Sequence, residues 1–173
     1  MKKITLTLSM ILILIYLSGC TPTRIWTSSP PFTTVENQLF RAELLPLSDD
    51  KNFMSQFRLL VWNRSGKDLE IDWASTRFIH NGRNHGRFIF EGLDENTVNN
   101  PPADIVPAGD RLMKVIAPVR LLAVKPLRSD VRQTTNFSAG PLPEGENGIA
   151  LVIRQNEQVI RETLTVKIRV AVK

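Results

Sequence analysis

The chain has 173 residues, of which 42% are hydrophobic and 23% charged, and 22 Lys and Arg against 17 Asp and Glu give a formal net charge of +5. One domain of this length buries about 68–70% of its unfolded surface, so a hydrophobic core can hold it without disulfides or metals. The charge is too small to indicate a nucleic-acid partner, and the single cysteine excludes an intramolecular disulfide.

The N-terminus has the pattern of an export signal. Lys2 and Lys3 precede an apolar stretch from Ile4 to Leu17, which is shorter than the ~20 apolar residues of a membrane-spanning helix. The stretch ends in Leu17-Ser18-Gly19-Cys20, which resembles the lipobox of bacterial lipoproteins. The resemblance implies that residues 1–19 are a cleaved signal peptide and that Cys20 receives lipid on its thiol. An ordinary signal peptide with a chance cysteine, or an uncleaved anchor, are the alternatives.

The same resemblance implies a location. Two or more acyl chains anchor a protein stably, and mature bacterial lipoproteins usually carry three. Thr21 follows the cysteine, whereas an Asp there retains lipoproteins in the inner membrane of well-studied enterobacteria. We therefore expect attachment to the outer membrane, with the domain facing the periplasm. Loss of Lys2 and Lys3 leaves 20 basic against 17 acidic residues, a net charge of +3.

Residues 20–37 are predicted to form a flexible tether, because they are rich in Thr, Ser and Pro. Seventeen extended residues reach about 60 Å, so the domain is expected to stand well off the membrane. Trp26 and Phe32 are expected to pack casually on the domain and not to bind lipid.

Residues 38–173 are predicted to form one β domain, because short β-type runs alternate with turn residues and no helical spacing is sustained. The clearest run is Thr163–Val172, in which every second residue is apolar. Before it, Ile149–Ile153 and Val159–Ile160 flank the polar residues 154–158 and are predicted to form a hairpin with a short turn, so the C-terminal third is predicted to be a β-meander. Further strands are expected at Leu39–Leu45, Phe57–Trp62, Leu69–Trp73, Thr76–His80, Arg87–Glu91, Leu112–Ile116 and Leu121–Val124. Some eight or nine short strands indicate a sandwich or a barrel.

Two connections have distinctive chemistry. Phe57–Trp62 and Leu69–Trp73 are interpreted as a strand pair whose turn is stabilised by Asn63 and Ser65. The Pro-containing stretch Asn96–Asp110 is expected to be a long connection and not a central strand. Asp68, Glu70 and Asp72 alternate along one strand and are expected to form a solvated outer face.

Phe57–Trp73, Phe78–Gly82 and Pro101–Gly109 resemble segments of uncharacterised bacterial lipoproteins with an immunoglobulin-like β-sandwich. In those proteins a strand ends in Asn-x-Ser/Thr, a second ends in Trp, and a Pro-rich stretch precedes the next strand. The resemblance covers Phe57 to Gly109 and implies an all-β, immunoglobulin-like β-sandwich of about eight or nine short strands behind the signal peptide. It implies a fold and not a function.

The candidate chemistry is sparse. His80 and His85 flank a predicted hairpin turn, so their rings can approach, but zinc needs three or four protein ligands and no third is at a recognisable spacing. We therefore expect no metal and no cofactor. Ser65 and Ser75 lack the Gly-x-Ser-x-Gly setting of a hydrolase nucleophile, and catalysis is not expected.

Basic and aromatic residues alternate between Arg77 and Phe90 and form the strongest local positive charge in the sequence. The preferred interpretation is a strand pair with inward aromatics and outward arginines. The alternative is a functional basic patch whose partners are anionic groups of the cell envelope. The patch comprises Arg77, His80, Arg83, His85 and Arg87.

The leading hypothesis is a non-catalytic interaction module that is anchored by acylated Cys20 and contacts another envelope protein. One alternative is an accessory or pilot lipoprotein of a secretion or surface-appendage system. Another is a periplasmic hydrolase or small-ligand binder that uses Asn96–Asp110 together with His80 and His85. A protease inhibitor is a weaker alternative, since no reactive loop is evident.

Overall fold

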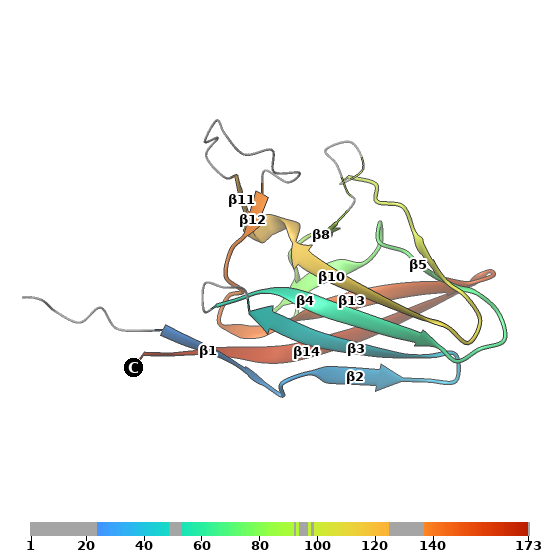
Figure 1. The fold of residues 1–173 in the computed structure, drawn as a ribbon, viewed down its shortest axis with the longest axis horizontal. Coiled ribbons are helices and arrows are strands. Elements are labelled where there is room, and N and C mark those ends of the chain that lie inside the picture. The colour runs from blue at the N-terminus through green and yellow to red at the C-terminus, as the bar shows by residue number, and fades with distance from the viewer. Residues whose placement is uncertain are drawn as a thin grey trace, which may run out of the picture.

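The structure is a computed structural model that describes residues 24–48, 53–91, 93, 97, 99–124 and 137–172. Within these ranges the chain is all-β and forms two antiparallel sheets that pack face to face (Figure 1). No helix in the described part of the chain is long and apolar enough to cross a membrane. The predicted signal peptide and Cys20 lie outside the described residues.

Sheet A has seven strands, in the order β1-β14-β13-β5-β9, with β6 also on β13 and β7 on β6. Its strands are β1 (Arg24–Ser29), β5 (Leu69–Ile71), β6 (Arg77–His80), β7 (Arg83–Asn84), β9 (Asp104–Val106), β13 (Gly145–Gln155) and β14 (Gln158–Val172).

Sheet B has five strands, in the order β2-β3-β4-β10-β8. They are β2 (Thr33–Glu36), β3 (Phe40–Ser48), β4 (Met54–Asn63), β8 (Phe88–Phe90) and β10 (Arg111–Pro118). A 3₁₀ turn (Val119–Leu121) follows β10, and β11 (Leu122–Val124) pairs with β12 (Phe137–Ala139) as a separate two-stranded sheet.

The core lies between the two sheets because alternate residues of each long strand are apolar. In β4 the buried residues are Phe57, Leu59 and Val61, and Phe57 contacts Phe78 and Phe88 at ring-centroid distances of 6.4 and 6.5 Å. The facing strands of sheet A supply Ile149, Leu151, Ile153, Leu164, Val166 and Ile168.

The predicted hairpin with a polar turn between Ile153 and Val159 is confirmed, but the separate last strand of the predicted meander is wrong, since Val159–Ile160 and Thr163–Val172 belong to one strand that pairs with β13. The turn of the hairpin is Asn156-Glu157, and Asn156 has a φ of +54°, which Asn tolerates well. β14 runs without a break from Gln158 to Val172. Glu162 interrupts the apolar alternation of this strand in the sequence, because it is a polar residue at an inward-facing position. In the structure it is half-buried and accepts a 3.3 Å hydrogen bond from Asn37.

The predicted tether is also wrong over Arg24–Glu36, which forms β1 and β2. β1 pairs with β14 over Arg24–Ser29, and β2 pairs with β3 over Thr33–Glu36, so the chain passes from sheet A to sheet B at Pro30-Pro31. The Thr- and Ser-rich composition of this segment is typical of a linker, but the segment pairs with the edges of β14 and β3. Trp26 packs against Phe53 with ring centroids 6.0 Å apart.

β4 and β5 do not pair, although the sequence predicted them as neighbours: β4 lies in sheet B and β5 in sheet A. Asn63 fixes the crossing as a buried side chain whose amide donates to the carbonyls of Lys67, Val106 and Pro107 at 2.8, 2.9 and 3.0 Å. Its Oδ1 accepts from the Ser65 amide at 2.9 Å and hydroxyl at 2.7 Å. The predicted turn role of Asn63 and Ser65 is therefore confirmed, but the turn joins two sheets.

The predicted solvated carboxylate face holds only in part. Asp72 is buried and accepts hydrogen bonds from the guanidinium of Arg154 at 2.6 and 3.0 Å. Asp68 is exposed and accepts from the Ala108 amide at 3.1 Å. The stretch Asn96–Asp110 is mainly connection, as expected, but it contains β9, a three-residue strand at the edge of sheet A.

Candidate binding surfaces

The two histidines meet at the β6–β7 hairpin, as the sequence predicted, with ring centroids 5.7 Å apart. His80 Nδ1 lies 3.1 Å from the carbonyl oxygen of Glu146, and the amide nitrogen of Asn81 lies 3.1 Å from His80 Nε2. A carbonyl only accepts and an amide nitrogen only donates, so Nδ1 of His80 is placed to donate and Nε2 to accept. Both ring nitrogens of His80 are therefore engaged.

His85 is partly exposed at the end of the same hairpin. Desolvation lowers the pKa of His85 below its ordinary value, and the nearby charges of Arg120, His80 and Arg83 lower it further. The Arg120 guanidinium donates to His85 Nδ1. No group of three or more His, Cys, Asp and Glu side chains in the described part of the chain is placed to hold a metal ion.

The predicted basic patch is only partly assembled. Arg77 points to the opposite face of β6 from His80 and donates to the carbonyls of Ala74 and Thr76 at 2.7 and 2.9 Å. Arg87 reaches the carbonyl of Asn99. Arg83, His80 and His85 stay together, and Arg120 joins them from the 3₁₀ turn. No local pattern indicates a role for Arg120, because it lies 35 residues from His85.

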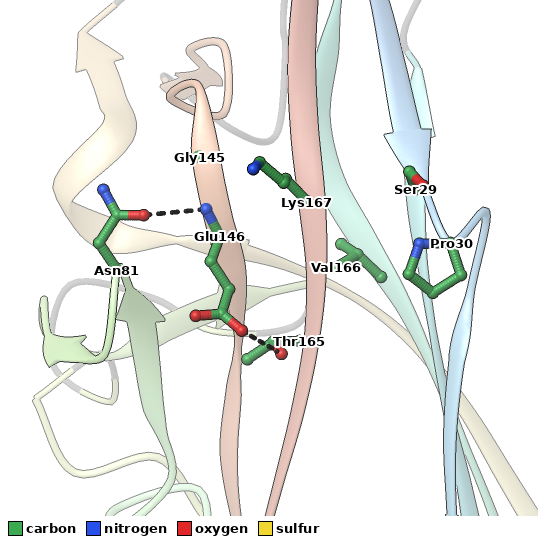
Figure 2. Close-up of a pocket in the computed structure, with 8 residues that line it drawn as sticks. All are labelled: Ser29, Pro30, Asn81, Gly145, Glu146, Thr165, Val166 and Lys167. Atoms are coloured by element: carbon green, nitrogen blue, oxygen red, sulfur yellow. Dashed lines mark hydrogen bonds between the residues drawn. The ribbon is translucent and has the colours of Figure 1, made fainter.

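A shallow groove of about 520 Å³ crosses the end of sheet A next to this hairpin (Figure 2). Asn81 and Thr165 both turn toward Glu146: Asn81 Oδ1 accepts from the Glu146 amide at 2.9 Å, and the Thr165 hydroxyl donates to its carboxylate at 2.8 Å. Neither histidine lines the groove. Its lining is Ser29, Pro30, Asn81, Gly145, Glu146, Thr165, Val166 and Lys167.

The outer face of sheet B presents apolar and cationic side chains. Met113 and Val115 of β10 are 64% and 41% exposed. Their cross-strand partners on β4 are Leu60 and Arg58. One position further along the sheet, Trp62 lies between Arg111 and Arg41, and the Arg41 guanidinium is 5.3 Å from the centroid of the indole ring. This face therefore combines exposed hydrophobic area with positive charge.

The two sides of β10 are paired over different stretches of the strand. Its residues Arg111–Ile116 pair with β4, whereas β8 pairs only with Ile116–Pro118. Within the described ranges, no strand pairs with the β8 side of β10 over its first five residues.

The hydrogen-bond pattern shows which backbone groups this edge presents. In an antiparallel strand, alternate residues direct both their N–H and C=O to the same neighbour. The carbonyl of Asp110 accepts from the Asn63 amide at 2.8 Å, and the amide of Val119 bonds toward the β8 side at 3.0 Å, so even positions face β4 and odd positions face away. The residues whose backbone groups point to the open edge are Arg111, Met113 and Val115.

The inward side of β10 is closed by an ion pair. Lys114 contacts the carboxylate of Asp104 on β9, and its ammonium lies 4.0 Å from the Phe90 ring centroid. The same Asp104 carboxylate accepts a 2.7 Å hydrogen bond from the indole N–H of buried Trp73. An inward-pointing lysine can deter edge pairing, but Asp104 neutralises this one.

No protein-family model matches the chain, and no curated protein matches it. The fold therefore places the chain only in the class of all-β proteins built from two packed antiparallel sheets. Sequence reasoning predicted β10 as a strand but missed its open edge. The available signal was weak, because apolar residues occupy both alternating sets of β10, at Leu112 and Ile116 and at Met113 and Val115.

Proposed function

We propose that the chain is a lipid-anchored, non-catalytic interaction module that binds an extended segment of another envelope protein along the open edge of β10. The open edge carries the proposal, because a row of unpaired strand N–H and C=O groups is a template for an added strand. Acylated Cys20 is the anchor, the lipobox-like Leu17-Ser18-Gly19 directs cleavage, and the outer membrane is the site of attachment.

The side chains around the edge select the partner. Main-chain hydrogen bonds supply affinity in strand addition, and side chains at alternate positions supply specificity. Met113 and Val115 offer apolar contacts, and Arg58 and Arg111 offer cations on the same face. The partner segment is therefore one in which every second residue faces this surface, with apolar residues opposite Met113 and Val115 and Asp or Glu opposite Arg111.

We also propose that the sandwich is of the immunoglobulin-like type. Two features support this: a large buried tryptophan, Trp73, between the sheets, and an N-terminal segment that pairs first with sheet A and then with sheet B. Further strands at the edges, as in β6–β7, are additions to that plan.

The docking proposal is tested by selecting a random dodecapeptide display library on the full chain. We expect enrichment of peptides in which every second residue is apolar, with Asp or Glu at the one of these positions that lies opposite Arg111. Val115→Pro removes an N–H that points to the open edge and no β4 bond, so it abolishes their binding, whereas Val115→Thr keeps most of it. Circular dichroism checks the fold of both variants.

A second substitution guards against misfolding of the proline variant. Arg111→Glu retains the backbone edge but reverses the charge, and we expect it to reject acidic peptides. Enriched peptides that bind Val115→Pro and Arg111→Glu as well as they bind the parent chain would refute the proposal, as would a selection with no enrichment.

The anchor has its own test. We expect the mature chain to begin at Cys20 and to carry the mass of its acyl chains, and Cys20→Ser to release the protein from membranes. An unmodified cysteine would refute the anchor and leave the edge proposal intact.

A further inference from the structure

β1 and the end of β14 form a two-stranded ribbon that projects beyond the rest of sheet A. β13 starts at Gly145, opposite Ile168, so the last four residues of β14 in the described chain pair only with β1. We call the outer end of the ribbon, Arg24–Thr27 and Arg169–Val172, the ribbon tip. The ribbon tip lies at the left end of Figure 1, where β1 begins.

The ribbon tip combines exposed apolar residues with cations. Ile25 is 42% exposed and Val172 is 67% exposed, while Arg24 and Arg169 are exposed cations. Ile25 pairs with Ala171, and Val172 pairs with Arg24, so apolar groups occupy both faces of the ribbon. The eight residues of the ribbon tip include no Asp or Glu. Such a surface is complementary to phosphate-bearing lipid headgroups over an apolar layer.

Because Arg24 already belongs to β1, the tether between Cys20 and the domain is shorter than the sequence predicted. The predicted tether spanned about 60 Å, but the chain is already bound to sheet A at Arg24. Only four Cα–Cα steps separate Cys20 from Arg24, and these span at most about 14 Å. The headgroup region of one leaflet is roughly 5–8 Å thick. A lipidated Cys20 therefore holds the ribbon tip within reach of the headgroups.

We propose that the ribbon tip is a membrane-binding surface that seats in the headgroup layer of anionic phospholipid and orients the domain. Ile25 and Val172 enter the layer, and Arg24 and Arg169 bind lipid phosphates. The seat rests on the lipidation of Cys20 proposed above. Each basic residue near an anionic surface strengthens membrane binding by about fivefold, so the two arginines together contribute about 25-fold.

The test places a nitroxide label at Val172→Cys in the full lipidated chain, reconstituted in vesicles of phosphatidylglycerol and phosphatidylethanolamine. Acylation blocks Cys20, so the new thiol is the single labelling site. The matched control is Val159→Cys, at the other end of β14 and 36% exposed. We expect the label at 172 to be shielded from a water-soluble nickel chelate and the label at 159 to be fully accessible.

Charge reversal isolates the arginines. Arg24→Glu combined with Arg169→Glu is expected to return the label at 172 to water, while Arg161→Glu, an exposed residue on the same strand, leaves it shielded. Vesicles of phosphatidylcholine alone are expected to reproduce the effect of the double reversal.

The outcomes separate the seat from the anchor. A chain that carries acyl mass and floats with the vesicles, but whose labels at 172 and 159 are equally accessible to the chelate, overturns the seat and leaves the anchor standing. Shielding that persists after double reversal and in phosphatidylcholine overturns the anionic specificity. A chain without acyl mass overturns the anchor and the seat together.

Discussion

Replacing Gly148 with alanine tests how tightly the β13–β14 hairpin is closed. A Cβ at this position would lie 2.0 Å from the carbonyl oxygen of Leu164 and 2.7 and 2.8 Å from Cγ2 and Cα of Thr165. Ordinary contacts begin at 3.4 Å, so the two strands would have to part by more than about 1 Å. The nearest obstacle is backbone, which cannot rotate away as a side chain does. Overpacking of a core costs about 1–3 kcal/mol, and we expect Gly148→Ala to lie at or above the upper end.

Urea unfolding measures this cost. With a slope of about 2 kcal/mol per molar urea, a loss of 3 kcal/mol lowers the transition midpoint by about 1.5 M. Gly66→Ala is the matched control, because a Cβ there meets nothing within 4 Å, and we expect a change within about 0.5 kcal/mol. Equal midpoints for the two variants would refute the argument from close strand approach.

Two further predictions concern buried polar groups. Asn63→Ala leaves three carbonyls without their shared donor, and we expect it to lower the free energy of unfolding by about 2–4 kcal/mol, against under 0.5 kcal/mol for the exposed Asn84→Ala; urea midpoints decide. Burial alone would raise the pKa of Asp72, but hydrogen bonds from Arg154 and Ser75 outweigh it and lower that pKa. The bonded carboxylate therefore stabilises the fold above the unfolded pKa, and this contribution is lost as pH falls through the lower folded value. We expect the stability gap between the parent and Arg154→Ala, measured by urea unfolding, to be larger at pH 7 than at pH 3; an equal gap would contradict the ion-pair assignment.

Local patterns in the sequence predicted most strands but not how they assemble. The alternation in Thr163–Val172 and the Asn-x-Ser turn after β4 are local features, and both are present in the structure. Pairing is set by contacts far apart in sequence. Asn63 commits the β4–β5 turn to a crossing between sheets by bonding Val106, 43 residues away, which no local pattern reveals.

Edge strands escaped prediction for a related reason. A three-residue strand such as β9 gains its order from its partners, not from its own propensity. The segment Arg24–Glu36 is Ser-, Thr- and Pro-rich and read as a linker, yet the edges of β14 and β3 pair with it.

In the candidate sites too, local contacts were predictable from the sequence and contacts between distant residues were not. The approach of His80 and His85 followed from a short hairpin, whereas the contact of His85 with Arg120 and the open edge of β10 depend on tertiary placement. Asp72 likewise accepts a hydrogen bond from Arg154, 82 residues away, and is buried, although its alternation with Asp68 and Glu70 predicted a solvated face.

The two proposed surfaces lie far apart on the sandwich, and their separation bears on how the proposed anchor would orient the domain. β10 begins at the right of Figure 1, and the ribbon tip is at the left end. In sheet B two strands, β3 and β4, separate β10 from β2, which continues from β1. A stem of only four Cα–Cα steps restricts how the domain can tilt when Cys20 is held in the bilayer. Under both proposals, seating the tip would direct the Arg111 end of the open edge away from the membrane, where a partner segment could reach it without displacing lipid.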